Sequence, residues 1–167
     1  MKNIYLAGGC FWGVEEYFKQ IKGVTLTSVG YANGNSLDAS YKTIKETNHA
    51  EAVYIEYNEE IVGLEFLLEM YYKVIDPTSV NKQGEDVGTQ YRTGIYYTST
   101  SDLEIINKSI SNLENTLNIK VAIEIEELKG YVDAEEYHQD YLEKNPTGYC
   151  HISKSSFEDA KNTTPIK

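Results

Sequence analysis

Cys10 occupies a position in the sequence that suits a nucleophilic thiol. It follows an apolar run at residues 4–7 and the pair Gly8 and Gly9, and an apolar stripe with helical spacing begins directly after it. Unpaired backbone N–H groups at a helix N-terminus, together with the helix dipole, favour a thiolate over a thiol. We therefore predict that Cys10 is a reactive nucleophile. The alternative is a small buried cysteine without reactivity, which is the commoner fate of this residue type.

Glu51 is a candidate proton donor, because its strand directs it toward the interior. Alternate residues of a strand share one face, and Glu51 has the parity of Val53, Ile55 and Tyr57 in the expected strand at 49–57. Burial on that face would raise the pKa of the carboxyl and keep it protonated near neutral pH. Such an acid can donate a proton to a substrate. An exposed glutamate at the end of the strand is the equally open alternative.

Trp12 lies off the apolar stripe of the helix that follows Cys10. The residues three, four and seven positions later are Glu15, Glu16 and Lys19, so the indole shares the polar face. A tryptophan there, two residues from a reactive sulfur, is well placed to contact an apolar group of a ligand. A tryptophan covered by a loop or by the C-terminal segment is the alternative.

Two other classes of function remain open at this point. A cysteine and a histidine could carry out acyl transfer, but no spacing singles out one of His49, His138 and His151 as the partner of Cys10. An acidic, tyrosine-rich binding module with inert thiols is the third class. A zinc site is disfavoured, because Cys150 and His151 are adjacent and neighbours seldom both reach one metal. We expect neither a metal nor a cofactor.

The elements that would position these residues alternate between strands and helices. Apolar spacing and turn residues predict strands at 4–7, 24–32, 49–57, 93–97 and 121–125, and helices at 11–21, 61–74, 101–117 and 134–144. This order predicts an α+β two-layer sandwich: a mixed sheet with a split βαβ, ferredoxin-like core and helices largely on one face. Residues 76–90 form a long loop. Residues 151–167 are expected to be a long, irregular, loosely structured tail of a single domain, 1–167.

Composition and charge exclude several functions and favour the cytoplasm. The chain has 15 Lys and Arg against 26 Asp and Glu, so its net charge is −11, which argues against binding nucleic acid or an anionic membrane. No apolar run approaches the ~20 residues that a membrane span needs. The apolar run at 4–7 is also shorter than the ~7–15 residues of a signal peptide core. With two cysteines, the chain fits a compartment that keeps thiols reduced.

Five ordered motifs, spread over almost the whole chain, resemble the peptide methionine sulfoxide reductase A (MsrA) family. They are GCFWG at 9–13, GYANG at 30–34, HAEAV at 49–53, QGEDVGTQYR at 83–92, and YHQDYL with KNPTGYC at 137–150. Asn33 stands where the family has a glycine. The resemblance implies reduction of methionine S-sulfoxide, free or in peptides and oxidised proteins, to methionine. It also implies an α+β two-layer domain.

The resemblance assigns a role to each matching residue. Cys10 would attack the sulfoxide sulfur, and Glu51 would protonate its oxygen. The residues that would bind the substrate are Phe11 and Trp12 at the methyl group, Tyr41 and Tyr91 at the oxygen, and Asp86 on the polar side of the pocket. The chemistry requires these types, because the oxygen leaves only as water or hydroxide and the methyl group needs an apolar wall.

The resemblance further implies how the enzyme is recycled. Attack leaves a sulfenic acid on Cys10, which Cys150 would resolve as a disulfide. A thioredoxin or glutaredoxin-type reductant would then reopen that disulfide. Many relatives carry a further cysteine in a glycine-rich tail, but residues 151–167 contain neither cysteine nor glycine. We therefore expect direct reduction of a Cys10–Cys150 disulfide.

Overall fold

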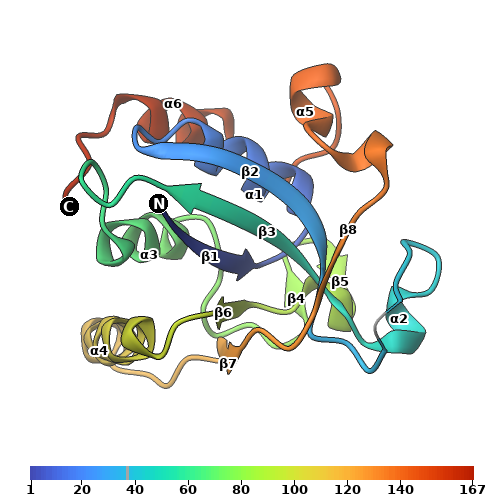
Figure 1. The fold of residues 1–167 in the computed structure, drawn as a ribbon, viewed down its shortest axis with the longest axis horizontal. Helices are drawn as coiled ribbons and strands as arrows, with labels where there is room; N and C mark the ends of the chain where they lie inside the picture. The colour runs from blue at the N-terminus through green and yellow to red at the C-terminus, as the bar shows by residue number, and fades with distance from the viewer. Residues whose placement is uncertain (37) are drawn as a thin grey trace.

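A six-stranded mixed sheet forms the centre of the computed structural model, which describes residues 1–36 and 38–167 (Figure 1). The strand order is β7-β6-β1-β3-β2-β8, and every neighbouring pair is antiparallel except β6 and β7. The strands are β1 (Lys2–Ala7), β2 (Val24–Ala32), β3 (Ala50–Tyr57), β6 (Gly94–Tyr97), β7 (Glu124–Glu127) and β8 (Tyr131–Asp133). The expected mixed α+β architecture is therefore confirmed.

The described part of the chain has six α-helices beside the sheet, and α1 follows β1 after the two glycines. They are α1 (Phe11–Lys19), α2 (Ile44–Thr47), α3 (Leu64–Tyr72), α4 (Thr100–Leu117), α5 (Tyr141–Lys144) and α6 (Lys154–Asn162). The expected long loop contains the small hairpin of β4 (Lys82–Gln83) and β5 (Asp86–Val87), followed by the 3₁₀ turn Thr89–Tyr91.

The two faces of the sheet are packed differently. On one face, Ile4, Leu6, Val53 and Ile55 belong to a large core with residues of α1, α3, α4 and α6. The opposite face carries a small cluster of alanines around Tyr96, which strand and loop residues cover. Many of the tyrosines are core residues, since five of the largest fully buried side chains are tyrosines. Because the helices lie on the first face, the start of α1 and the inward side chains of β3 meet there.

The expected helix at 134–144 is wrong over most of its length. The structure has a 3₁₀ turn at Glu136–His138 and the single-turn helix α5, and Asp140 separates them with a φ of 54°. A residue in the left-handed region interrupts a helix, and aspartate tolerates that region better than most residue types. Apolar spacing alone did not reveal this break.

The expectation of a loosely structured tail at 151–167 is also wrong. This segment contains the helix α6, which begins after Ser153, whose hydroxyl accepts a hydrogen bond from the Ser156 N–H at 3.2 Å. Ile152 and Ala160 are buried, and α6 packs against α1. The C-terminal end is held where the Gly63 N–H donates to the Ile166 carbonyl at 2.8 Å. The segment is therefore packed against the rest of the domain although it has few apolar residues.

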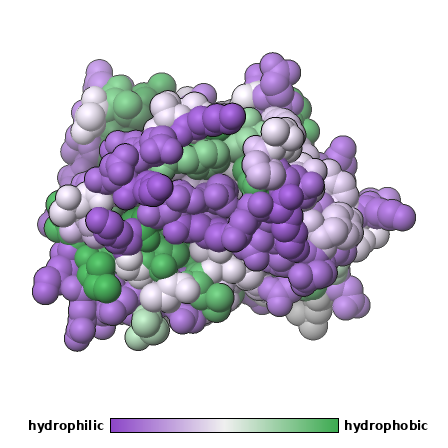
Figure 2. Space-filling model, turned by 90° about the horizontal axis from the view of Figure 1, so that it is seen from above, coloured by the Kyte–Doolittle hydropathy of each residue, from purple (hydrophilic) through white to green (hydrophobic). Residues whose placement is uncertain are grey.

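Hydrophilic residues cover most of the face seen in Figure 2, with small separate hydrophobic patches between them. This surface fits the net charge of −11. Within residues 1–36 and 38–167, the helices are too short or too polar to cross a membrane.

Candidate active site

Cys10 lies at the N-cap of α1, at the point where the chain turns away from the sheet. Its backbone is extended, with φ −63° and ψ 126°, and its side chain is buried. Gly9 makes the turn possible, because its φ of 78° is a conformation that other residues rarely adopt. The Gly9 N–H donates to the Tyr91 carbonyl at 3.2 Å, and the Cys10 N–H donates to Asp86 Oδ2 at 3.3 Å. The predicted strand–glycine–cysteine–helix arrangement is confirmed.

The predicted thiolate is not the resting form of Cys10. Burial raises the pKa of the thiol well above its ordinary value, and the nearby Glu51 raises it further. The Trp12 N–H of the first helical turn lowers the pKa, but this effect is smaller than that of burial. The site therefore holds a protonated thiol at neutral pH, and the attack on a substrate requires a proton acceptor.

Glu51 is buried beneath Cys10, as the strand parity predicted. Its Oε1 accepts a hydrogen bond from the Phe11 N–H at 3.2 Å, whereas no described residue is hydrogen-bonded to its buried Oε2. Burial raises the pKa of the carboxyl to about 8, despite the opposing Phe11 N–H. A large fraction of the protein therefore carries a neutral carboxylic acid at pH 7, with one oxygen free to donate toward a bound substrate.

Phe11 and Trp12 form an aromatic wall with His138 and Tyr141, neither of which was predicted to bind the substrate. Phe11 is buried, with its ring 5.3 Å from the ring of His138. Trp12 is half-buried, stacks on Tyr141 at 3.7 Å, and donates from Nε1 to His138 Nδ1 at 3.0 Å. Both predicted residues thus lie at the start of α1 beside Cys10. His138 and Tyr141 both belong to the YHQDYL motif at 137–142, and this motif could have indicated that they lie at the site.

Tyr41 and Tyr91 lie at the same site although different loops carry them. The pKa of each hydroxyl is raised first by burial and next by Glu51, and the Tyr91 hydroxyl lowers the pKa of Tyr41. The Tyr41 ring remains 44% exposed and lies 5.0 Å from the ring of His138. Glu135 Oε2 accepts the Tyr41 N–H at 3.2 Å, which anchors this loop. The predicted substrate-binding tyrosines are therefore brought together near Glu51.

Asp86 connects the loop at 83–92 to both ends of the site. Its Oδ2 accepts the Cys10 N–H, and its Oδ1 accepts the Tyr149 hydroxyl at 2.9 Å. Arg92 holds the loop in place by donating to the Asn48 carbonyl at 3.1 Å and to Glu124 at 3.0 Å. A carboxylate is therefore fixed against the N-terminus of α1, where it also contacts the segment that carries Cys150.

Cys150 lies in the segment 145–152, which we call the C-terminal turn. Its Sγ accepts a hydrogen bond from the Ile152 N–H at 3.3 Å and rests against Gly13, one helical turn after Cys10. A Cβ atom at Gly13 would approach this Sγ to 2.7 Å, so only glycine leaves room for the sulfur. Both cysteines are free thiols. The structure thus represents the reduced protein. The Cys150 thiol rests against α1, the helix whose N-cap is Cys10.

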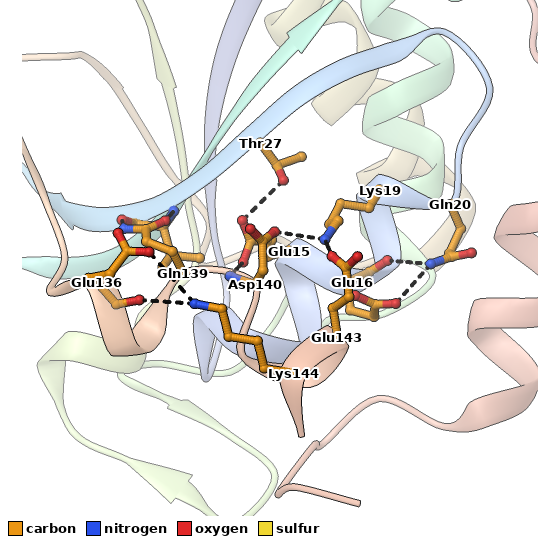
Figure 3. A network of polar contacts seen from close by, with 11 residues as sticks. Glu15, Glu16, Lys19, Gln20, Thr27, Glu136, Gln139, Asp140, Glu143 and Lys144 are labelled. Carbon is orange, nitrogen blue, oxygen red and sulfur yellow. Dashed lines mark hydrogen bonds and ion pairs between the residues drawn. The ribbon is translucent and has the colours of Figure 1, made fainter. Parts of the chain in front are cut away.

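A polar network ties the chain around Asp140 to helix α1 (Figure 3). Glu15 is buried and accepts hydrogen bonds from the Thr27 hydroxyl at 3.0 Å and the Asp140 N–H at 2.8 Å. Lys19 forms ion pairs with Asp140 and Glu143. The spacing of the helix placed Glu15 on the polar face, and its burial was not predicted because its partners are more than ten residues away along the chain. The network fixes the segment that leads into the C-terminal turn.

The three histidines have different surroundings. His49 Nδ1 is hydrogen-bonded to the Thr47 hydroxyl at 2.7 Å, and His138 Nδ1 accepts the Trp12 N–H. His151 lies in the C-terminal turn with its ring against Gly9. Their spacing along the chain did not distinguish these surroundings.

Comparisons with known proteins agree on one family. The family described as "Peptide methionine sulfoxide reductase" matches residues 2–166. The peptide methionine sulfoxide reductase MsrA of Lachnoclostridium phytofermentans is 55% identical over 163 residues, which are 96% of this chain and 98% of that protein. The crystal structure of reduced Mxr1 from Saccharomyces cerevisiae has a TM-score of 0.86 and 38% identity, with 91% of each chain covered. Mxr1 in complex with Trx2 has a TM-score of 0.62 and 29% identity, covering 84% of each chain.

Proposed function

The chain belongs to the peptide methionine sulfoxide reductase family, and on that basis we propose how its own residues perform the reaction. It is a peptide-methionine (S)-S-oxide reductase, an oxidoreductase that returns the S-sulfoxide of methionine to methionine. The observation that carries the residue assignment is the Glu51 carboxyl, which lies under a buried cysteine and has one unpartnered oxygen.

The first step transfers the sulfoxide oxygen to Cys10. The sulfoxide oxygen accepts a proton from Glu51 while Tyr41 and Tyr91 donate hydrogen bonds to it. The Cys10 sulfur attacks the substrate sulfur and forms an S–S bond with it. The protonated oxygen then moves to the Cys10 sulfur as the substrate S–O bond and the S–S bond break, and methionine leaves. Cys10 ends as a sulfenic acid, two electrons more oxidised, and the substrate sulfur is reduced by two electrons. Phe11 and Trp12 hold the methyl group against an apolar wall.

The second step closes a disulfide and releases water. The Cys150 thiol attacks the sulfenic sulfur of Cys10, and the hydroxyl leaves as water with the thiol proton. A thioredoxin or glutaredoxin-type dithiol then reduces the disulfide by exchange. The position of the Cys150 sulfur one helical turn from Cys10 supports this assignment, and Mxr1 is known in complex with Trx2.

The test separates this function from the alternatives by its stoichiometry. Racemic methionine sulfoxide with excess dithiothreitol should be consumed to one half, because the enzyme acts on one epimer. A Cys150→Ser protein without reductant should still form one equivalent of methionine and should carry a sulfenic acid on Cys10 that dimedone traps. The wild-type protein should form one equivalent and a Cys10–Cys150 disulfide. A wild-type protein that accumulates sulfenic acid and never forms the disulfide contradicts the role of Cys150.

The comparisons give no support to the acyl-transfer alternative with Cys10 and a histidine. We propose in addition that residues 1–167 form one reductase domain, and the family match over residues 2–166 supports this. Its central strands would form a split βαβ, ferredoxin-like core, which the order β6-β1-β3-β2 with antiparallel neighbours supports. The enzyme would work in the cytoplasm, where thiols are kept reduced, without binding nucleic acid or membranes.

A further inference from the structure

His151 is a buried base whose hydrogen-bonding capacity is unused. Its side chain is 9% exposed, and neither Nδ1 nor Nε2 has a hydrogen-bond partner among the residues that the structure describes. A buried imidazole normally bonds through at least one nitrogen, because an unpartnered polar atom costs the desolvation free energy of that group. His49 and His138 each follow this rule through Nδ1.

The imidazole of His151 lies against Gly9, the residue that precedes the nucleophile Cys10. Its ring rests on Gly9, where a Cβ atom would come within 2.9 Å of Cε1 and 3.1 Å of Nε2. Gly9 directly precedes Cys10, so the absent side chain is what lets the ring approach this part of the site. On its other side, Nδ1 lies 3.8 Å from Asp86 Oδ2, the same oxygen that accepts the Cys10 N–H.

The reaction has a proton that the other residues of the site do not accept. Glu51 begins as an acid and gives its proton to the sulfoxide oxygen, so it is not a base for the thiol in the same step. Cys10 begins as a protonated thiol, because burial and Glu51 raise its pKa. His138 Nδ1 is occupied by the Trp12 N–H. His151, whose ring rests on the residue before Cys10, offers an unpartnered lone pair for this proton.

We propose that His151 accepts the proton that the Cys10 thiol loses as its sulfur attacks the sulfoxide. The step is balanced as follows: Glu51 gives a proton to the oxygen, the thiol gives a proton to His151, methionine leaves, and Cys10 becomes a sulfenic acid. Asp86 then faces the resulting imidazolium across 3.8 Å and stabilises its charge. The proton returns from His151 to Glu51 through solvent between turnovers. This inference rests on the proposed function.

The surroundings of His151 keep it neutral before the reaction. Asp86 from β5 lies 3.8 Å from its Nδ1. Cys10 follows the Gly9 on which the ring rests, and Tyr149 and Cys150 precede His151 in its own turn. Burial lowers the pKa of His151, and Asp86 opposes this effect. The imidazole is therefore deprotonated near neutral pH and is able to accept a proton.

The experiment measures the first equivalent of methionine, released without reductant, in the full-length protein. His151→Ala should release it at least ~100-fold more slowly than the wild type, the low end of what a positioned proton acceptor contributes. The substitution leaves space on Gly9, so added imidazole should restore much of the rate. The wild-type rate should fall at acidic pH as His151 becomes protonated, and His151→Gln should lack this acidic limb. Glu158→Ala, an exposed change in the same segment, and imidazole added to wild type are the controls.

Each result decides the proposal. A slow His151→Ala protein that imidazole rescues, together with loss of the acidic limb in His151→Gln, supports it. A wild-type rate in His151→Ala overturns it, and so does a slow protein that imidazole does not rescue and that keeps the acidic limb. If the wild-type protein itself releases no methionine, the proposed function fails and this inference fails with it. A fast His151→Ala protein beside an active wild type contradicts this inference alone.

Discussion

Cys10 and Glu51 are held by the sheet, whereas Cys150 and His151 are held by a turn. Glu51 is the second residue of β3, where it pairs with Tyr31 of β2, and Cys10 follows β1 after two glycines. The C-terminal turn has no strand of its own and rests on Gly9, Gly13 and a few side chains. The first pair can therefore keep a fixed geometry for oxygen transfer, while the second can move, as disulfide formation requires.

We call Cys10 and Glu51 the sheet-held pair, and Cys150 and His151 the turn-held pair. The largest effect is expected when the nucleophile of the sheet-held pair is removed. Cys10→Ser should abolish methionine formation even with excess dithiothreitol, because the hydroxyl is a far weaker nucleophile and no other thiol lies at Glu51. Methionine release is followed by chromatography, and thermal unfolding shows that the protein is folded. Substantial turnover would move the chemistry to Cys150 and remove the distinction between the two pairs.

Glu51→Gln should separate the catalytic role of the carboxyl from its shape. The amide has the same volume but no acidic proton, so the first equivalent of methionine should form ~10²–10⁴-fold more slowly. In the wild-type protein, the rate should fall as pH rises through about 8, because the carboxyl then loses its proton. Glu56→Gln in the same strand is the matched control. A Glu51→Gln protein with wild-type single-turnover rates at neutral pH would exclude the acid.

Glu51→Gln should slow the reaction but raise the stability of the folded protein. The carboxyl has its ordinary pKa of 4.5 in the unfolded chain and about 8 in the folded protein, so folding favours its protonated form. The contribution of Glu51 to the free energy of unfolding is fully present below pH 4.5 and is lost as pH rises toward 8. Glu51→Gln should therefore gain stability over the wild type across this range, by at most about 1.4 kcal/mol per pH unit. Urea unfolding at several pH values measures the difference, and a constant difference would contradict the burial of the charge.

Gly13→Ala should disturb the turn-held pair and leave the sheet-held pair intact. The new Cβ would lie 2.7 Å from Cys150 Sγ and 3.3 Å from the Ile152 side chain, so the C-terminal turn must move away. The first equivalent of methionine should form normally, whereas disulfide formation should slow about tenfold or more, since misplacement by about 1 Å costs up to ~10² in rate. Gly130→Ala is the control, because nothing lies within 4 Å of its Cβ position. Normal disulfide formation would show that the contact with Gly13 is dispensable.

The smallest effect is expected from the cap of α6. Ser153→Ala removes the hydroxyl that accepts the Ser156 N–H and should lower the free energy of unfolding by about 1 kcal/mol. Turnover with dithiothreitol should not change, because the cap touches neither cysteine. Ser111→Ala, an exposed site within α4, should be neutral in the same unfolding experiment. A large loss of turnover in Ser153→Ala would mean that α6 holds the C-terminal turn more tightly than its contacts indicate.

The sequence predicted the sheet-held pair better than the turn-held one, for a physical reason. Alternation in β3 determines the direction of Glu51, and the glycines before α1 determine the position of Cys10, so both follow from local pattern. The surroundings of Cys150 and His151 depend on contacts with Gly9 and Gly13, which are more than 130 residues away. No local period encodes such contacts.

Two other predictions were wrong for the same reason, because each depends on contacts that only the complete fold makes. The break at Asp140 depends on a left-handed backbone that a Thr27–Glu15–Asp140 network supports, and sequence spacing favoured a continuous helix there. The resting thiol of Cys10 was missed because burial by the completed fold outweighs the helix N-terminus, which was the only effect visible in the sequence.

The stacked pair of Trp12 and Tyr141 has an optical consequence. Trp12 is the one tryptophan of a chain with 15 tyrosines, so light absorbed by the tyrosines can be passed to a single indole. That indole lies beside Cys10, stacks on Tyr141 and donates its N–H to His138. Its emission is therefore a built-in, label-free signal of what occupies the pocket and of the oxidation state of the sulfur next to it. Stopped-flow fluorescence could follow individual steps of the catalytic cycle in the unmodified protein.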